Sequence, residues 1–157
     1  MGERHVVGLI SDTHGVVRAE VHTALAGVER ILHAGDVGGD DILDELELIA
    51  PVAAVCGNTD APGNGRLRES LDLEIGGLRV HVSHGHEVGS PNPARLAARY
   101  DADVIVYGHT HQQLVERVGA QLVVNPGAAG PRRFDLVPCV AILTIERGAA
   151  AVELRPL

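Results

Sequence analysis

Five short polar segments follow apolar runs along the chain, each at the point where a strand is expected to end and a loop to begin. They carry the carboxylate, amide and imidazole groups that divalent transition metals bind. Strand ends in an α/β sheet meet at one edge, which is where such folds bind their ligands. The pattern therefore predicts an α/β fold in which several loops assemble a metal site. The segments are Asp12-Thr13-His14-Gly15, Gly35-Asp36, Gly57-Asn58-Thr59-Asp60, Ser83-His84-Gly85-His86 and Gly108-His109-Thr110-His111.

The first 60 residues alternate between short β-branched runs and segments in which apolar residues recur at helical spacing. This β-α-β-α-β order is typical of a parallel sheet with crossover helices. Asp40 or Asp41 is expected to cap the second helix, and Pro51 is expected to stop it. We expect strands over residues 6–10, 30–34 and 52–56, and helices over 17–26 and between 40 and 50.

The second half of the chain has a different pattern. Residues 71–75 alternate between apolar and polar side chains, and Gly76-Gly77 separates them from a second such run, which predicts a β-hairpin. Hairpins imply antiparallel pairing, so two packed sheets flanked by helices are expected. The Gly- and Pro-rich stretch 61–68 is expected to be a loop inside one domain that spans residues 1–157. Further strands are expected over 78–82, 103–107, 114–118, 121–124, 140–146 and 151–155, and a helix over 93–100.

The composition narrows the classes of partner. The chain has 13 Lys and Arg against 21 Asp and Glu, a formal net charge of −8, which argues against stable binding of nucleic-acid polymers. A small phosphate ester remains compatible, because bound metal can reverse the local charge. Tyr100, Tyr107 and Phe134 are the only aromatic residues apart from histidine, so selectivity by stacking on a nucleobase is not expected.

Cys56 and Cys139 each lie beside apolar residues and are expected to be buried free thiols. No leader pattern is seen at the N-terminus, and no apolar run approaches the ~20 residues of a membrane span. A cytoplasmic protein that does not bind membranes is therefore expected, with homo-oligomer formation left open.

Each polar segment also has a simpler explanation. Asp12 and His14 are two residues apart and can reach the same ion, but Asp12 could instead cap a helix while His14 stays an exposed loop residue. Asp36 could bridge two ions or merely turn the chain. Asn58 follows Gly57, for which a turn is the default reading.

Two His-x-His pairs are harder to explain without a metal. His84 and His86 follow one expected strand, and His109 and His111 follow another. One such pair in a loop is weak evidence, but two pairs in a chain that also has Asp-x-His favour a metal centre.

In their order and spacing, the five segments resemble the calcineurin-like metallophosphoesterases. Asn125-Pro126-Gly127 and Pro131-Arg132 add a similarity to the small single-domain YfcE-type phosphodiesterase branch. The resemblance implies an α/β/β/α sandwich of two mixed sheets, formed by one domain without a cap domain. It also implies two divalent transition-metal ions, with Mn²⁺ favoured and Fe, Zn²⁺ or Ni²⁺ as alternatives, because the ligands mix nitrogen and oxygen.

The resemblance assigns ligands to both ions, with Asp36 shared between them. The first ion would be bound by Asp12, His14, Asp36 and His111, and the second by Asp36, Asn58, His84 and His109.

The chain departs from the family pattern at Thr59, where larger phosphatases have a histidine. A hydroxyl can donate a hydrogen bond but is too weak an acid to protonate an alkoxide efficiently. His86 could take that role beside the substrate, or the enzyme could favour good leaving groups. Asp60 matches an acidic position that would orient a neighbour rather than bind metal.

Four further residues are predicted not to be catalytic. His81 alternates with two valines and is expected to face outward, and His33 is expected either to support the site or simply to be buried. Arg132 or Arg133 could contact a phosphate oxygen, but a surface salt bridge is the preferred interpretation.

The resemblance implies an enzyme that hydrolyses phosphodiesters, and also phosphomonoesters, by attack of a hydroxide that bridges two metal ions. The alternative is a catalytically weak or inactive metal-binding scaffold for protein interaction, similar to the retromer subunit of this fold. All seven ligand positions are filled, which favours the enzyme.

Overall fold

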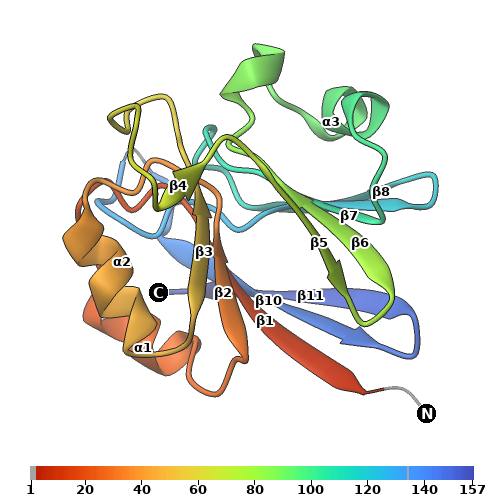
Figure 1. The fold of residues 1–157 in the computed structure, drawn as a ribbon, viewed down its shortest axis with the longest axis horizontal. Helices are drawn as coiled ribbons and strands as arrows, with labels where there is room; N and C mark the ends of the chain where they lie inside the picture. Colours follow the sequence, from red (N-terminus) through yellow and green to blue (C-terminus); the bar gives the residue numbers. More distant parts are fainter. Residues whose placement is uncertain (1–2, 134) are drawn as a thin grey trace.

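Two mixed β-sheets pack face to face in the computed structural model, which describes residues 3–133 and 135–157 (Figure 1). Phe134 lies outside the described residues. The first sheet contains, in spatial order, β11 (Ala149–Pro156), β10 (Cys139–Glu146), β1 (Arg4–Ile10), β2 (Arg30–His33), β3 (Val52–Val55) and β4 (Leu67–Arg68). The second contains β5 (Leu71–Ile75), β6 (Leu78–Val82), β7 (Val104–Val106), β9 (Gln121–Asn125) and β8 (Leu114–Val118).

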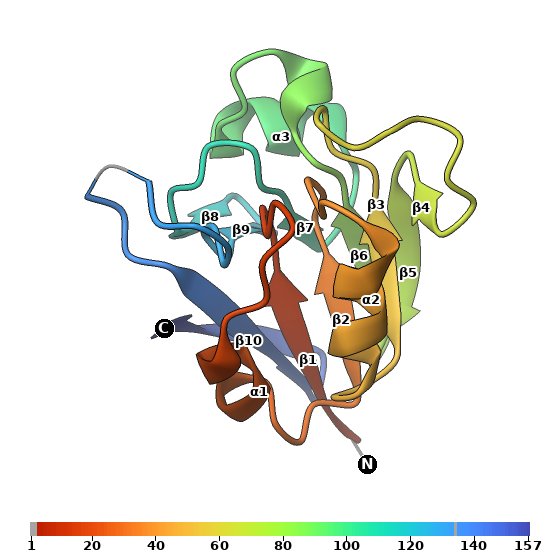
Figure 2. The same cartoon turned by 90° about the vertical axis from the view of Figure 1, so that its left-hand side faces the viewer.

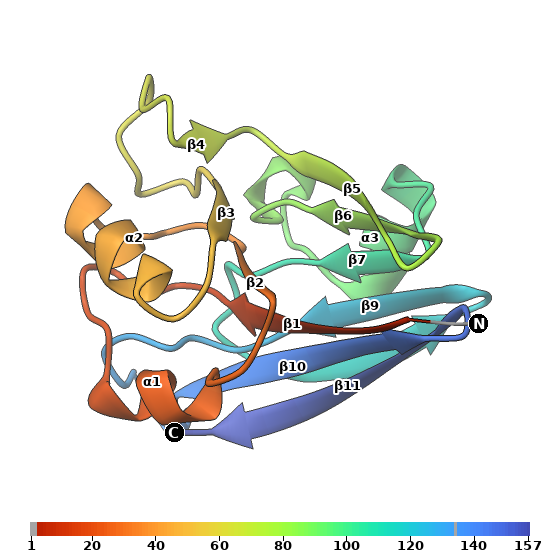
Figure 3. The same cartoon turned by 60° about the horizontal axis from the view of Figure 1, so that its bottom comes forward.

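Strands β1 to β4 run parallel, whereas β10 and β11 extend the same sheet in antiparallel fashion. Figure 3 shows β1 lying between β10 and β2. In the second sheet, β6, β7 and β9 are parallel, and the antiparallel strands β5 and β8 form its edges. The predicted mixed character of both sheets is confirmed.

Helices cover the outer faces of the two sheets. Helices α1 (Ala19–Ala24) and α2 (Asp40–Glu47) pack on the first sheet, and α3 (Pro93–Arg99) packs on the second (Figure 1). Apolar side chains fill three layers: between the sheets, under α1 and α2, and under α3. The four-layer α/β/β/α arrangement therefore follows from strands that bury both faces.

The hairpin predicted around Gly76-Gly77 is confirmed, with Ile75 paired to Leu78. Both glycines have positive φ, +56° and +85°, which suits the tight turns whose twist matches that of the flanking strands.

Two predictions about α2 are wrong in detail. Gly39 occupies the N-cap position, whereas Asp40 and Asp41 lie in the first turn, where their charge favours the helix dipole. Asp40 instead accepts a hydrogen bond from Asn64 at 2.7 Å. The helix ends at Glu47, before Pro51 could stop it. Helix α1 is also shorter than the predicted 17–26.

The stretch 61–68 is not entirely a loop, because its end forms the short strand β4. Leu67 and Arg68 pair in parallel with β3, and the backbone N–H of Cys56 donates to the Arg68 carbonyl at 2.7 Å. Two residues are too short to show a strand pattern in the sequence. Cys139 is a buried free thiol as predicted, whereas Cys56 is only partly buried.

His81 points away from the layer between the sheets, as its alternation with Val80 and Val82 predicted. Its side chain is nevertheless buried, because the outer face of β6 is covered there. The ring stacks on Tyr100 with centroids 3.8 Å apart, and its Nδ1 lies 2.8 Å from Asp72. Only 3% of His81 is exposed.

Within the described residues, no helix is long and apolar enough to cross a membrane.

Replacement of Leu143 by alanine should lower the free energy of unfolding by about 2–5 kcal/mol, because it leaves a cavity in the layer between the sheets. Urea titration followed by circular dichroism measures the change. Leu48→Ala is the control, because Leu48 is 80% exposed and its loss should cost less than about 0.5 kcal/mol. Equal effects of the two substitutions would contradict this assignment of the core.

Candidate metal centre

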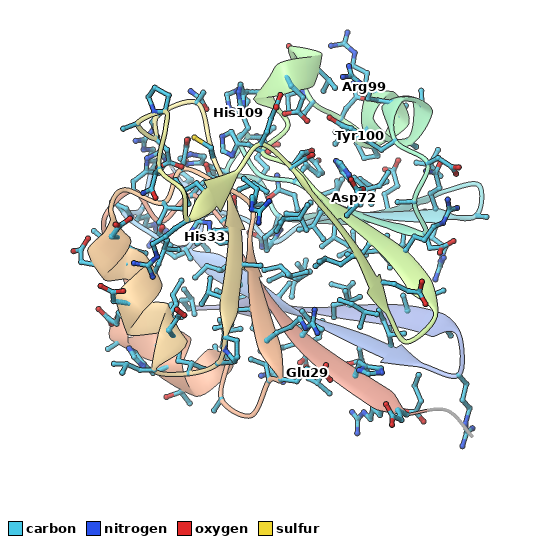
Figure 4. The ribbon with its side chains drawn as sticks, in the orientation of Figure 1. Glu29, His33, Asp72, Arg99, Tyr100 and His109 are labelled. Carbon is cyan, nitrogen blue, oxygen red and sulfur yellow. The ribbon has the colours of Figure 1, made fainter. Side chains whose placement is uncertain are left out.

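The polar segments predicted from the sequence meet where parallel strands of both sheets end. Figure 2 shows the loops that follow β1, β2 and β3 at one end of the first sheet. The loops after β6 and β7 of the second sheet reach the same place. His84, which follows β6, contacts Asp36, and His109, which follows β7, contacts Asn58. Figure 4 shows His109 at this end of the molecule and His33 below it.

One group of possible ligands consists of Asp12, His14 and His111. Asp12 Oδ1 lies 3.7 Å from His14 Nε2 and 3.4 Å from His111 Nε2. The two imidazole nitrogens are 3.3 Å apart. Three donor atoms from two loops therefore face one small volume, which suits one cation.

The second group consists of Asp36, Asn58, His84 and His109. Asp36 Oδ2 lies 3.3 Å from His84 Nε2. Asn58 Oδ1 lies 2.9 Å from His84 Nε2 and 3.1 Å from His109 Nδ1. Asp36 also faces the first group, since its Oδ2 is 3.6 Å from His14 Nε2. One carboxylate oxygen thus lies between the two groups.

The orientation of His84 favours a cation at this place. Its Nδ1–H donates to the Ala34 carbonyl at 2.8 Å, so in the neutral ring Nε2 carries a lone pair. This nitrogen faces the oxygens of Asn58 and Asp36, which also accept. Such a set of acceptors is stable only if a proton or a cation is shared among them. Burial alone lowers the pKa of His84, but the nearby Asp36 and Asp12 carboxylates outweigh it and raise the pKa.

The buried carboxylates of Asp12 and Asp36 are held in their ionised form, which can bind a cation. Burial by itself raises the pKa of Asp12, but the imidazoles of His111 and His14 outweigh it and hold that pKa well below its usual range. Burial also raises the pKa of Asp36, but the neighbouring His84 is the main group that outweighs it, and the pKa falls to about 2. Among the described residues, Asp12 Oδ1 is buried without a hydrogen-bond partner. An ionised, buried and unpartnered oxygen is costly unless a cation lies beside it, so the residues fit a metal centre.

Five of the seven proposed ligands have a backbone in the left-handed region, with φ between +46° and +71°. The only other non-glycine residue of this kind in the described chain is Arg147. This conformation is unfavourable for residues with a side chain and concentrates at functional sites. The five are Asp12, His14, Asp36, His109 and His111.

The glycines before two of the ligands are required by close packing. A side chain at Gly57 would collide with the Asp36 carboxylate, and one at Gly108 would collide with Ser11 and Asp12. Gly57 therefore lets the loop of Asn58 lie close to Asp36, and Gly108 lets the loop of His109 lie close to Asp12.

Asp60 holds two loops together rather than facing the ligands. Its carboxylate accepts from the backbone N–H groups of Val37 at 2.9 Å, Gly38 at 3.1 Å and Gly57 at 2.9 Å. The Asp60 carboxylate therefore joins the loop of Asp36 to the loop of Asn58.

Thr59 and His86 lie at the exposed side of the centre. Thr59 donates its backbone N–H to Asp36 Oδ1 at 2.9 Å, and its side chain is exposed. The ring of His86 lies 5.3 Å from the His84 ring and 6.3 Å from the His109 ring. Both side chains can therefore approach a substrate held at the centre.

His33 is buried behind the centre, as one of its two predicted readings required. Its Nε2–H donates to Thr13 Oγ1 at 2.9 Å, because the Thr13 hydroxyl itself donates to the Val37 carbonyl. Its Nδ1 accepts from Gly35 at 3.1 Å. Burial lowers the pKa of His33 to about 4, so the ring is neutral and joins the loops after β1 and β2.

Sequence reasoning missed three supporting residues. Ser11 donates to Asp12 Oδ2 at 2.7 Å, and Thr13 links two loops as described above. Asn125 donates to the Gly108 carbonyl at 3.2 Å and to Thr110 Oγ1 at 3.0 Å. Ser11 and Thr13 each lie directly beside Asp12, which was their only signal in the sequence, whereas Asn125 adjoins no proposed ligand.

Arg133 lines a shallow cavity of about 250 Å³ with His109 and His111, whereas Arg132 lies outside it. Both arginines are exposed, and neither forms an ion pair within the part of the chain that the structure describes. Both arginines line a second, smaller cavity that includes His111, so Arg133 borders both cavities and Arg132 borders one.

Comparison with known proteins supports the same interpretation. Residues 6–148 match the family model described as the calcineurin-like phosphoesterase superfamily domain. A probable metallophosphoesterase from Methanothermobacter thermautotrophicus is 39% identical over 150 residues, which cover 90% of this chain and 86% of the relative. A phosphodiesterase from Methanocaldococcus jannaschii is 31% identical over 160 residues, which cover 90% of this chain and 93% of that protein.

The fold has solved counterparts. The structure of Vacuolar Protein Sorting 29 from Cryptosporidium parvum superimposes with a TM-score of 0.82 at 23% identity, covering 98% of both chains. That similarity establishes the fold, and the family match and the relatives establish the family. The chain therefore belongs to the calcineurin-like phosphoesterase superfamily of metal-dependent phosphoester hydrolases.

Proposed function

We propose that the protein is a binuclear metal-dependent phosphodiesterase that also accepts phosphomonoesters. The position of Asp36 is the observation on which the proposal rests. Its Oδ2 lies 3.6 Å from His14 Nε2 and 3.3 Å from His84 Nε2, so one oxygen faces both groups of ligands. A carboxylate in this position can be shared by two cations and offsets part of the charge of each.

Seven residues would hold the two ions in the arrangement expected from the sequence. Mn²⁺ remains the favoured metal, with Fe, Zn²⁺ and Ni²⁺ as alternatives, because imidazole nitrogens are mixed with oxygens. When bound, the ions would supply a nucleophilic hydroxide near neutral pH and would offset the charge of the phosphate. The residues are Asp12, His14, Asp36 and His111 for one ion, and Asp36, Asn58, His84 and His109 for the other.

The residues around the ligands have separate tasks in this proposal. His86 is the candidate acid for the leaving group, because its ring is exposed and close to His84 and His109. Thr59 would donate a hydrogen bond to a phosphate oxygen. Asp60 is a positioning residue, because it accepts hydrogen bonds from two of the ligand loops.

Two cavities support a diester as the preferred substrate. One of about 460 Å³ includes His86 and Gly57, and the other of about 250 Å³ includes His109 and His111. A phosphodiester carries two alcohol groups and could place one in each cavity, whereas a monoester would use only one.

We propose a single domain without a cap, because only a loop and the short β4 separate Asn58 from β5.

A metal-binding scaffold is the second candidate function. The similarity to Vacuolar Protein Sorting 29 favours it, but that similarity extends to the fold alone. A scaffold could lose ligands without losing its function, whereas all seven ligand positions are filled in this chain, which favours the enzyme. The net charge of −8 also favours a small substrate over a nucleic-acid polymer. Cytoplasmic location and the oligomeric state stay predictions.

The substitution Asp36→Asn should remove the charge shared by the two ligand groups. With added Mn²⁺, hydrolysis of bis-p-nitrophenyl phosphate should fall at least about 100-fold, and bound metal should drop below about two ions per chain. Activity assays and elemental analysis measure both quantities. Asp101→Asn is the control, because the Asp101 side chain is 92% exposed. Retention of most activity by Asp36→Asn would contradict the shared role.

The substitution His86→Gln should separate substrates by their leaving groups. Hydrolysis of an alkyl diester should fall about 100-fold or more, whereas an aryl diester, which needs little protonation, should lose less than about fivefold. The ratio of the two kcat values is the measurement. His22→Gln provides a matched control, because His22 and His86 side chains are both 39% exposed. An equal loss on both substrates would exclude His86 as the acid.

A further inference from the structure

His86 lies on a short segment that cannot hold the imidazole in place by packing alone. The segment is the 3₁₀ helix η1 (His86–Val88), which begins two residues after the proposed ligand His84, and none of its residues is buried. The His86 side chain is 39% exposed. An acid must stay within hydrogen-bonding distance of the leaving oxygen, so a contact from outside the packed core has to fix the segment.

The carboxylate of Glu87 provides this contact. Its Oε1 accepts the backbone N–H of Gly85 at 2.9 Å and lies 3.9 Å from His86 Nδ1. Its Oε2 accepts from the Tyr100 hydroxyl at 2.7 Å. Burial raises the pKa of Glu87, but the hydroxyls of Tyr100 and Ser83 and nearby backbone N–H groups outweigh it and lower that pKa. The group is therefore ionised, and its two oxygens join the backbone beside His86 to the end of α3.

Tyr100 is itself held in one orientation. Its ring stacks on the His81 imidazole with centroids 3.8 Å apart, and the Arg99 guanidinium lies 5.5 Å from the ring centroid. His81 is fixed in turn, because it is 3% exposed and its Nδ1 lies 2.8 Å from Asp72 Oδ1. Figure 4 shows Tyr100 at the end of α3, above Asp72 of β5. The tyrosine that binds Glu87 is therefore held by the outer face of the second sheet.

We propose that Glu87 and Tyr100 are positioning residues that fix His86 as the acid for the leaving group. The inference deepens the proposed function and rests on it. As the P–O bond breaks, its electron pair goes to the alcohol oxygen, which takes the proton of His86. The hydrogen bonds of Glu87 go to Gly85 and Tyr100 and to none of the seven proposed ligands. The pair would therefore act on the transfer of the proton rather than on metal binding.

Removal of the Tyr100 hydroxyl tests the proposal in a double-mutant cycle. Tyr100→Phe keeps the ring that stacks on His81 and loses the hydrogen bond to Glu87. With Mn²⁺ bound, kcat for an alkyl diester should fall about tenfold, whereas kcat for bis-p-nitrophenyl phosphate and both KM values should change less than about twofold. In the His86→Gln background, Tyr100→Phe should cost less than about twofold, because the acid that it positions is already absent.

Glu87→Gln should show the same dependence on the leaving group, because an amide retains only one of the two accepting oxygens. Glu74→Gln is the matched control, since Glu74 is an exposed glutamate of β5 outside this set of contacts. Elemental analysis should find the same metal content in all of these variants.

Nuclear magnetic resonance provides a measurement that needs no turnover. In the Zn²⁺-loaded protein, the ring Cε1–Hε1 signal of His86 is assigned by its absence from His86→Gln. This signal should shift or broaden in Tyr100→Phe, because the ring is no longer held in one orientation. It should stay in place in Glu74→Gln.

Equal losses on the two diesters, additive losses in the double variant, or an unchanged His86 signal in Tyr100→Phe would overturn the proposal. Hydrolysis by the wild-type protein separates this failure from failure of the proposed function. Hydrolysis without these effects of Tyr100→Phe would refute only the positioning role. A His86 signal that depends on Tyr100, in a protein that hydrolyses no diester, would support the positioning of the ring and contradict the phosphodiesterase.

Discussion

The carboxylate of Asp36 is the constraint on which the rest of the site depends. It follows β2, and its Oδ2 faces ligands that come from β1 and from the second sheet. Its other oxygen accepts the N–H of Thr59, which fixes the orientation of the group. Both sheets must therefore pack in one register for a single oxygen to reach His14 and His84. The aliphatic layer between the sheets supplies that register, which links core packing directly to metal chemistry.

Several features of the site raise the free energy of the folded protein, and the rest of the fold must offset them. Two carboxylates are buried and ionised, and five ligands have left-handed backbones. The loops that carry them are held by side chains behind the centre. Asp60 accepts from three backbone amides, while His33 and Thr13 join the loops after β1 and β2. These contacts preorganise the ligands, so that binding a cation relieves repulsion rather than ordering the loops.

The strands and the polar segments that follow them could be predicted because their signals are local. An apolar run followed by a polar segment marks a buried strand and its loop, and the hairpin at Gly76-Gly77 has a turn of fixed geometry. Tertiary packing decided what the sequence missed. His81 has the alternation of an outward residue, yet Tyr100 covers it. The role of Thr13 and the cavity of about 460 Å³ depend on segments far apart in the chain, which no local pattern reveals.

The central claim is that two ions share Asp36 in one centre. Electron paramagnetic resonance of the wild-type protein, titrated with Mn²⁺ to saturation, tests it most directly. The account predicts the spectrum of a spin-coupled pair that reaches full intensity at about two ions per chain. A spectrum of isolated Mn²⁺ that saturates at about one ion per chain would contradict it.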